Sequence, residues 1–404
     1  MGEKTMELYI HIPFCEKKCD YCDFLSFTAN EDTQRAYMEA LLREISYYGG
    51  KCMDYRVVTV YIGGGTPTFL KGETIVDLMK AVRRAFAIDE NAEISIECNP
   101  GTVTDRKLQL YREAGINRIS IGLQSADDKE LQLLGRIHTF DQFLKTYDMA
   151  RRSGFTNINI DLINALPGQK AEDFYRTLQQ VTRLKAEHLS VYSLMIEKGT
   201  PFYDIYKFDV VKQQAGLRTV SLPTEDEIYR ITKVTERTLA EAGYKQYEIS
   251  NFAKPGFECR HNIGYWKREN YLGLGLGASS LMENIRYSNL RELYPYMDES
   301  KRLREGLWQN ETEELPATNM HASAERILRK AQIEEFMFLG LRMNEGITRE
   351  RFATCFGVEI EALYEDVMRK LEGNGLLAKR AGHIFLTERG RDLSNYALAQ
   401  FLLS

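Results

Sequence analysis

Short β-branched segments alternate with longer helix-like segments through the first half of the chain, and this alternation constrains the fold more than any other feature. A strand–helix–strand order produces parallel strands that are joined by right-handed crossovers. The predicted strands are 8–12, 57–62, 94–97, 118–121, 158–162 and 189–194, and the predicted helices between them include 33–48, 73–86, 105–114, 140–153 and 171–184. We therefore predict an α/β fold, a partial (β/α)6 barrel similar to an open TIM barrel.

Polar and glycine-containing motifs follow these predicted strands one after another. Cysteines follow the first strand, Gly63-Gly64-Gly65-Thr66-Pro67 follows the second, and Glu97 ends the third. Gln124 follows the fourth strand and Asp161 lies on the fifth. The carboxyl ends of parallel barrel strands meet at one face, where active sites lie. We therefore expect these residues to form one site, in which three glycines without β-carbons let a cofactor approach the backbone.

Three cysteines, Cys15, Cys19 and Cys22, have the spacing C-x3-C-x2-C. Iron–sulfur clusters are normally held by four cysteines, so three thiolates would leave one iron of a [4Fe–4S] cluster open to a non-protein ligand. The alternative is a structural zinc site, which needs four ligands and usually two separated pairs. No second pair is present, and the direction of His11 would be set by its strand, so the spacing favours the cluster.

Size, charge and the remaining cysteines exclude several classes of protein. The chain has 404 residues, with 53 basic and 58 acidic residues and a net charge of −5, which is not typical of a protein whose main partner is nucleic acid. No apolar run is long enough to span a bilayer, and the first residues do not resemble a signal peptide. Cys52, Cys98, Cys259 and Cys355 are scattered, which indicates a reducing cytoplasm.

The second half of the chain has a different pattern. We predict a helix over 225–242, a strand over 244–249 and, from residue 324, helices over 324–342, 348–356 and 360–373. Two short strands, 376–379 and 384–386, then turn at Gly382, which together predicts a winged-helix-like module. Its helices carry too many acidic residues to bind phosphates, so we expect this module to act as a lid or as a protein-contact surface. The predicted domains are 1–240, 241–310 and 311–404.

Two further features of this half concern ligands. The run Gly273–Gly277 lacks the strand, helix and acidic residue of a dinucleotide site, and close-packed backbone is the better interpretation. His261, followed by Tyr265 and Trp266, could bind haem iron through its imidazole, and Cys259 could supply a thiolate instead. A structural histidine is the alternative, and the sequence alone does not decide between these interpretations.

Several motifs together resemble the oxygen-independent coproporphyrinogen III dehydrogenase family of the radical S-adenosylmethionine (SAM) superfamily. They are Leu8–Cys15, Gly63–Thr68, Ile121–Ser125 and Asn159–Ile163. The resemblance implies a radical SAM partial barrel and one of two functions, namely oxidative decarboxylation of coproporphyrinogen III to protoporphyrinogen IX or a haem chaperone that delivers haem to respiratory enzymes.

Three features resemble the chaperone branch. Phe24 stands where the dehydrogenases have a further cysteine, only fourteen residues precede Cys15, and the segment from His261 to Trp266 matches the H-N-x-x-Y-W motif of the chaperones. The resemblance thus implies a cytoplasmic haem chaperone with acceptor proteins that include membrane-associated respiratory enzymes, and the dehydrogenase is the alternative.

The resemblance also assigns residues to cofactors. Cys15, Cys19 and Cys22 would bind the [4Fe–4S] cluster, and His261 would handle haem. The residues implied to line SAM are Tyr9, Tyr21, Gly64, Gly65, Thr66, Glu97, Gln124, Arg136 and Asp161. No catalytic residue is implied, and whether the chain is an enzyme stays open at this stage.

Overall fold

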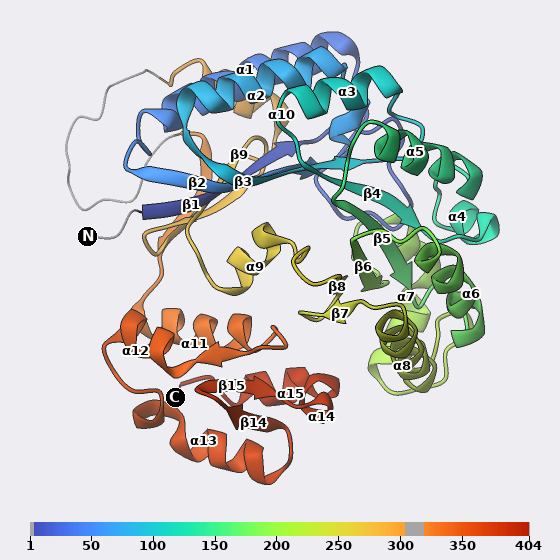
Figure 1. Ribbon diagram of the computed structural model, residues 1–404, viewed down its shortest axis with the longest axis vertical. Helices are drawn as coiled ribbons and strands as arrows, with labels where there is room; N and C mark the ends of the chain where they lie inside the picture. The colour runs from blue at the N-terminus through green and yellow to red at the C-terminus, as the bar shows by residue number, and fades with distance from the viewer. Residues whose placement is uncertain (1–3, 304–318, 404) are drawn as a thin grey trace.

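The computed structural model describes residues 4–303 and 319–403. Within these ranges one 12-stranded sheet forms the larger part of the molecule, with the strand order β12-β11-β10-β9-β1-β2-β3-β4-β5-β6-β8-β7 (Figure 1). The six predicted strands lie in sequence order and pair in parallel. They are β1 (Lys4–Ile12), β2 (Tyr55–Gly64), β3 (Ala87–Cys98), β4 (Arg118–Gln124), β5 (Ile158–Asn164) and β6 (His188–Ser193). The prediction of an open parallel barrel is confirmed.

Helices cover the outer face of this sheet, as Figure 1 shows. Local sequence explains where they begin, since Asn30 caps α1 and Thr104 caps α3, while Thr139 and Gln142 form a capping box on α5. Their apolar faces pack on the strands in one continuous core. These helices are α1 (Glu31–Gly49), α2 (Gly72–Ala85), α3 (Asp105–Glu113), α4 (Asp128–Leu133), α5 (Phe140–Arg152) and α6 (Ala171–Thr182).

The sheet continues beyond β1 with four strands that the periodicity did not reveal. β9 (Tyr271–Leu274) pairs in parallel with β1, and β10 (Ser279–Met282), β11 (Ile285–Asn289) and β12 (His321–Arg326) follow in antiparallel order. A β-carbon on Gly273 would collide with the carbonyl of Ser279, so the glycine run is close-packed backbone, as predicted. The prediction of a helix from residue 324 was wrong there, because β12 pairs with β11 first and α11 (Arg329–Gly340) begins later.

The other edge of the sheet also differs from the prediction. A helix, α8 (Glu225–Glu241), is present as expected, but the single strand predicted over 244–249 was wrong. Two short antiparallel strands stand in its place, β7 (Lys245–Gln246) and β8 (Asn251–Ala253), because the chain reverses between them and β8 pairs with β6. The helices that were not predicted include α7 (Pro201–Gln214), α9 (Arg260–Trp266), α10 (Leu293–Ser300) and the short α4. None of the helices in the described ranges is long and apolar enough to cross a membrane.

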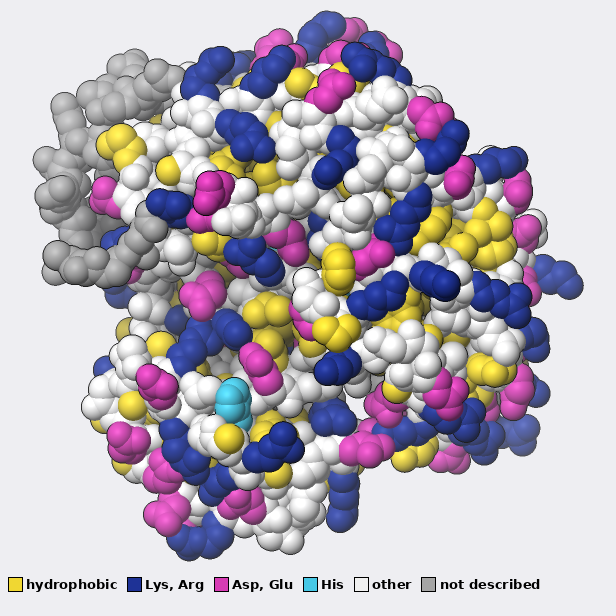
Figure 2. All heavy atoms as spheres, viewed as in Figure 1, with side chains coloured by type: hydrophobic (Ala, Val, Ile, Leu, Met, Phe, Trp, Pro, Cys, Tyr) yellow, Lys and Arg dark blue, Asp and Glu magenta, His cyan; other side chains and the backbone are white. Residues whose placement is uncertain are grey.

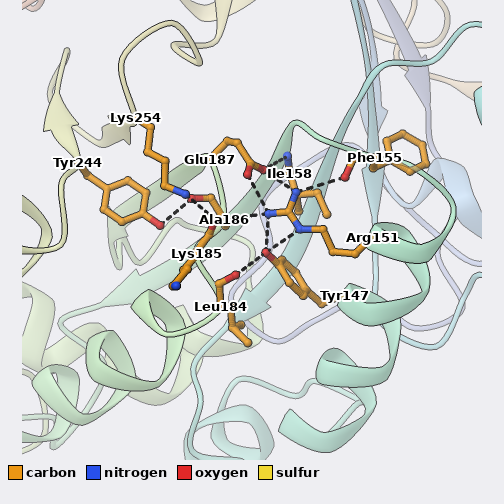
Figure 3. A network of polar contacts seen from close by, with 10 residues as sticks. All are labelled: Tyr147, Arg151, Phe155, Ile158, Leu184, Lys185, Ala186, Glu187, Tyr244 and Lys254. Carbon is orange, nitrogen blue, oxygen red and sulfur yellow. Dashed lines mark hydrogen bonds and ion pairs between the residues drawn. The ribbon is translucent and has the colours of Figure 1, made fainter.

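The amino-terminal ends of β5 and β6 carry a network of polar contacts, shown in Figure 3. Arg151 forms an ion pair with Glu187 at 2.8 Å, and Glu187 also accepts a hydrogen bond from the backbone of Ile158 at 3.1 Å. Tyr147 and Tyr244 donate to the carbonyls of the turn between α6 and β6. The network lies at the end of the strands opposite to the polar motifs, so its role is to stabilise the barrel.

The C-terminal residues form a second, smaller body with its own apolar core. Its elements are α11, β13 (Ile347–Thr348), α12 (Arg349–Phe356), α13 (Glu361–Gly373), β14 (Leu377–Arg380), β15 (His383–Leu386), α14 (Glu388–Asp392) and α15 (Ser394–Ala399). The strand order β13-β15-β14 and the two helices before the last hairpin agree with the predicted winged-helix-like module. Basic and acidic side chains are interspersed over the face shown in Figure 2. The predicted boundary at 310 lies outside the described residues, and the boundary at 240 stays a prediction.

Side chains tie this module to the sheet. Arg351 forms an ion pair with Glu269 at 2.8 Å, and the Arg342 guanidinium lies over the Trp266 ring at 5.5 Å. Helix α9 therefore lies between the barrel strands and the module, as Figure 1 shows.

Candidate functional site

The loop after β1 carries the three clustered cysteines. Its backbone is held at both sides, because the Asp20 amide donates to the Leu134 carbonyl at 3.3 Å and the Asp20 carbonyl accepts from the Phe202 amide at 3.0 Å. All three cysteines are free thiols. They line a cavity of about 330 Å³ at the carboxyl ends of the barrel strands, which we call the cluster pocket.

The three thiols have polar neighbours that suit thiolates. Thr66 Oγ1 donates to Cys15 Sγ at 3.5 Å, and Arg136 Nη1 donates to Cys19 Sγ at 3.5 Å. Burial raises the pKa of Cys15 and of Cys22, which favours the neutral thiols, and a bound cation would oppose this effect. Within residues 4–303 and 319–403 no three His, Cys, Asp or Glu side chains converge on one ion. A cubane cluster does not require this, because each thiolate binds a different iron, and the donor set fits such a cluster.

The glycine strip after β2 forms one wall of the cluster pocket. Gly64 has φ +112°, and a β-carbon on Gly65 would lie 2.8 Å from the Phe14 carbonyl oxygen, so both positions need glycine. The Gly64 amide donates to Glu97 Oε2 at 3.0 Å, and the Tyr61 hydroxyl donates to Glu97 Oε1 at 3.0 Å. Burial, with a smaller contribution from Asp161, raises the pKa of Glu97 to about 7.

Arg136, Gln124 and Asp161 also line the cluster pocket. Arg136 Nη2 donates to Asn99 Oδ1 at 3.0 Å and to the Gly122 carbonyl at 2.7 Å. Arg136 Nε and Gln124 Oε1 are buried without hydrogen-bond partners among the described residues. Asp161 accepts from Ser120 at 2.7 Å, and burial raises its pKa. Unpaired buried polar atoms beside a cavity indicate that a polar ligand completes the site.

The structure brings most of the predicted SAM residues together. Those that line the cluster pocket are Tyr21, Gly64, Gly65, Thr66, Glu97, Gln124, Arg136 and Asp161. Tyr9 does not line it, and its hydroxyl bonds His11 Nδ1 at 2.9 Å instead. Asn99 was missed, although it follows Glu97 in the same motif and bonds both Thr66 and Arg136. Cys98 is buried in the core and also borders the cluster pocket.

A second cavity, of about 690 Å³, adjoins the cluster pocket, and we call it the aromatic cleft. Tyrosine rings and arginines line much of it. These residues are Tyr9, Tyr61, Tyr265, Tyr271, Arg268, Arg286 and Arg291. The two cavities share a wall, since Phe24, Tyr61, Gly64 and Glu97 line both. A flat ligand in the aromatic cleft would therefore lie next to a ligand in the cluster pocket.

His261 lines the aromatic cleft from α9, but both of its ring nitrogens are occupied. Nδ1 lies 2.7 Å from Thr59 Oγ1, and Nε2 lies 3.0 Å from the Tyr265 hydroxyl. Cys259 is fully buried, contacts Glu93 at 3.5 Å and is not among the lining residues. Burial raises the pKa of Cys259 to about 12, which opposes thiolate formation. Contact with the cleft thus favours His261 over Cys259 as a group that a ligand could reach.

A buried carboxyl lies beside His261. Glu7 Oε2 is 3.7 Å from Nδ1, close enough for an ion pair if both groups were charged. Burial raises the pKa of Glu7 to about 9 and lowers the pKa of His261 to about 3. Both groups are therefore neutral near pH 7, and the imidazole has the neutral form in which it binds metal ions.

Comparisons with known proteins agree with this geometry. Residues 9–181 match the Radical SAM superfamily, and residues 327–393 match the HemN C-terminal domain. A solved structure of coproporphyrinogen III oxidase (HemN) from Escherichia coli superposes with a TM-score of 0.80 at 25% identity, covering 99% of this chain and 90% of that one. Radical SAM proteins bind a [4Fe–4S] cluster and SAM, for which the cluster pocket has the donor set.

Sequence relatives specify the branch. The heme chaperone HemW of Lactococcus lactis is 34% identical over 100% of this chain and 99% of its own length. HemW of Bacillus subtilis is 34% identical and HemW of Escherichia coli 33% identical, each with 98% of both chains covered. Identity at this level over whole chains shows that the chain belongs to the HemW heme chaperone family of radical SAM proteins.

Proposed function

We propose that this chain is a haem chaperone, which binds haem in the aromatic cleft and passes it to acceptor proteins in the cytoplasm or at the membrane. The observation that carries the proposal is the aromatic cleft itself, about 690 Å³ in size, lined by tyrosines and arginines and joined to the cluster pocket by a shared wall. Aromatic rings can pack on a porphyrin, and guanidinium groups can bind its carboxylates. Membrane-associated respiratory enzymes are the acceptors that we propose.

We assign the cluster pocket to the resident cofactors. Cys15, Cys19 and Cys22 would each bind one iron, and the cluster with SAM would supply redox chemistry at an open iron. Glu97 and Asp161 would hold cationic or hydroxyl groups of SAM, and the absence of a β-carbon at Gly64 would leave room beside the backbone. Arg136, next to Cys19, would stabilise the negative charge of the thiolates.

We assign the haem iron to His261. The imidazole is neutral and lines the cleft, and the Tyr265 hydroxyl covers Nε2. Rotation of Tyr265 away from its 3.0 Å contact would free this nitrogen for iron. Thr59 would keep hold of Nδ1 and so fix the orientation of the ring, as second partners of metal-binding histidines commonly do.

A titration with haem tests the proposal. The anaerobically purified full-length protein, loaded with cluster and SAM, should give a saturable 1:1 complex with a sharp Soret band. Addition of apomyoglobin should then show transfer of haem. Absence of saturable binding, or a complex that never releases haem to an acceptor, would overturn the proposal.

A second candidate function follows from the structural likeness to HemN. The same protein, given dithionite, SAM and coproporphyrinogen III, would form protoporphyrinogen IX if it were a dehydrogenase. We expect no multiple-turnover product. Catalytic turnover would replace the chaperone proposal with the enzymatic one.

A further inference from the structure

Three arginines meet at the aromatic cleft, and the most buried of them is incompletely bonded. The Arg268 side chain is only 10% exposed. Its Nε donates to Glu335 Oε2 at 2.8 Å and its Nη1 donates to Asn284 Oδ1 at 2.7 Å. Its Nη2 is buried without a hydrogen-bond partner among the described residues. A buried guanidinium N–H next to an open cavity is a donor that lacks its acceptor.

The two other arginines are more accessible. Arg286 Nη2 donates to Glu335 Oε1 at 2.9 Å, and its Nη1 lies 3.6 Å from Glu325, whose side chain is 65% exposed. Arg291 is exposed and forms no ion pair within residues 4–303 and 319–403. Two of the three guanidinium groups therefore share one buried carboxylate, and the third, that of Arg291, is open to a ligand beside the aromatic walls.

The carboxylate that these arginines share comes from the C-terminal module. Glu335 lies on α11 with its side chain 15% exposed, and its two oxygens divide between Arg268 and Arg286. Leu339, one turn later on the same helix, also lines the cleft. Glu335 thus bonds the guanidinium groups that an anionic ligand of the cleft would need, and it does so from the C-terminal module.

We propose that Arg268, Arg286 and Arg291 bind the carboxylates of a flat, aromatic dicarboxylate, and that Glu335 is the internal carboxylate that such a ligand displaces. The inference rests on the proposed function, under which these are the two propionates of haem. Planar guanidinium groups bind carboxylates through paired, charge-assisted hydrogen bonds, and a second ligand carboxylate can reach the exposed Arg291.

Displacement of Glu335 has a structural consequence. Its ion pairs with Arg268 and Arg286 join α11 to the segments around β9 and β11. When the ligand takes over these arginines, one of the ties between the module and the barrel opens, while the ion pair of Arg351 with Glu269 stays. Occupation of the cleft would therefore loosen the module without releasing it.

Comparison of haem with its dimethyl ester tests the proposal, because the ester keeps the flat ring and iron but lacks the carboxylates. We expect Arg286→Gln and Arg291→Gln each to weaken binding of haem roughly tenfold, the equivalent of one charge-assisted hydrogen bond, and to leave ester binding unchanged. Glu335→Gln should strengthen haem binding roughly tenfold, because the competing charge is removed, and should leave the ester unaffected. Glu365→Gln and Arg369→Gln, at an exposed ion pair of the C-terminal module far from the cleft, are the matched controls.

Each outcome decides the proposal. Equal losses for haem and ester in the arginine variants, or weaker haem binding in Glu335→Gln, would overturn it, while haem binding by the wild type would leave the proposed function standing. If the wild type bound neither haem nor ester, the proposed function and this inference would both fail. Should Glu335→Gln unfold, as circular dichroism would show, the two arginine variants with the two ligands still decide.

Discussion

The cluster pocket and the aromatic cleft share a wall but are built in different ways. Side chains of the cluster pocket come from the ends of successive barrel strands, from Cys15 after β1 to Asp161 on β5. Those of the aromatic cleft come from β1 and β2 together with α9, the strands β9 to β11, and α11 of the C-terminal module. The parallel barrel thus provides the cluster pocket, and the later segments add a second cavity beside it.

The shared wall connects these two sites. Glu97 bonds both Tyr61 and the backbone of Gly64, and all three residues face both cavities. Changes confined to one cavity should therefore affect one ligand, whereas changes in this wall should affect both. The following predictions test that division.

Loss of one cluster thiol should have the largest effect. We expect Cys19→Ala to abolish the iron–sulfur absorption after anaerobic reconstitution, because the remaining two thiolates leave two irons without protein ligands. Cys355→Ala, a change at an exposed thiol, is the control and should keep its cluster. If haem still binds to Cys19→Ala, the two cavities are separable; simultaneous loss of haem binding would contradict the division.

A substitution in the shared wall should have the second-largest effect. Gly64 has φ +112°, and a β-carbon there would lie 2.5 Å from His11 Nδ1. Gly64→Ala should lower the free energy of unfolding by about 2–4 kcal/mol, the sum of backbone strain and overpacking. Gly101 has φ +86°, and a β-carbon there would meet no atom within 4 Å, so Gly101→Ala should cost only about 1 kcal/mol.

Denaturant unfolding of both variants, with SAM and haem titrations, measures this effect. We expect Gly64→Ala to weaken both ligands and Gly101→Ala to weaken neither. Equal destabilisation by the two substitutions would show that contact with His11 is unimportant.

The pH dependence of SAM binding should be smaller. Burial raises the pKa of Glu97 from 4.5 to about 7, so the carboxyl is neutral at pH 6 and ionised at pH 8. An ionised Glu97 attracts the ammonium group of SAM, and we expect affinity to fall roughly tenfold from pH 8 to pH 6. Glu97→Gln should bind weakly at both pH values. The effect on folding has the opposite sign, because the raised pKa makes Glu97 lower stability as pH rises from 4.5 to about 7.

Calorimetric titration with SAM at the two pH values provides the measurement. A wild-type affinity that does not change between pH 6 and pH 8 would exclude this role for Glu97. Haem binding should also change over this interval, because Glu97 lines both cavities, whereas His261, with a pKa of about 3, does not titrate in it.

Removal of one hydroxyl should have the smallest effect. Tyr265→Phe frees His261 Nε2, and we expect haem affinity to rise about fivefold, the equivalent of about 1 kcal/mol, with a more low-spin spectrum. In a His261→Ala background the same substitution should change neither quantity. If the gain in haem affinity persisted without His261, the aromatic ring at position 265, and not the imidazole of His261, would control haem binding.

Sequence reasoning predicted the barrel and the cofactor site because both follow local rules. The strands are short apolar runs, and each polar residue, from the cysteines to Asp161, follows or ends one of them. Helix starts at Asn30 and Thr104 also follow from single capping residues. Such patterns involve only residues that are close together in the chain, so they can be recognised from a single sequence.

The aromatic cleft could not be predicted in the same way. The pairing of β9 with β1 and the docking of α11 bring together Arg268, Arg286 and Glu335. Neither the pairing nor the docking can be recognised from neighbouring residues in the sequence. Likewise, nothing near His261 in sequence shows that Thr59 and Tyr265 occupy its nitrogens. Strand β12 was predicted as part of a helix because its small and charged residues show no alternation of apolar and polar side chains. Its strand conformation is determined by pairing with β11.

The anchoring of Asp20 has a consequence for the order of biosynthesis. The iron-binding loop leaves the ribosome early, yet its backbone is pinned by Leu134 and Phe202, which are made much later. A nascent chain that ends before Phe202 therefore has thiols but no finished cradle for them. We therefore expect the three thiols to hold a cluster stably only after most of the barrel has been translated.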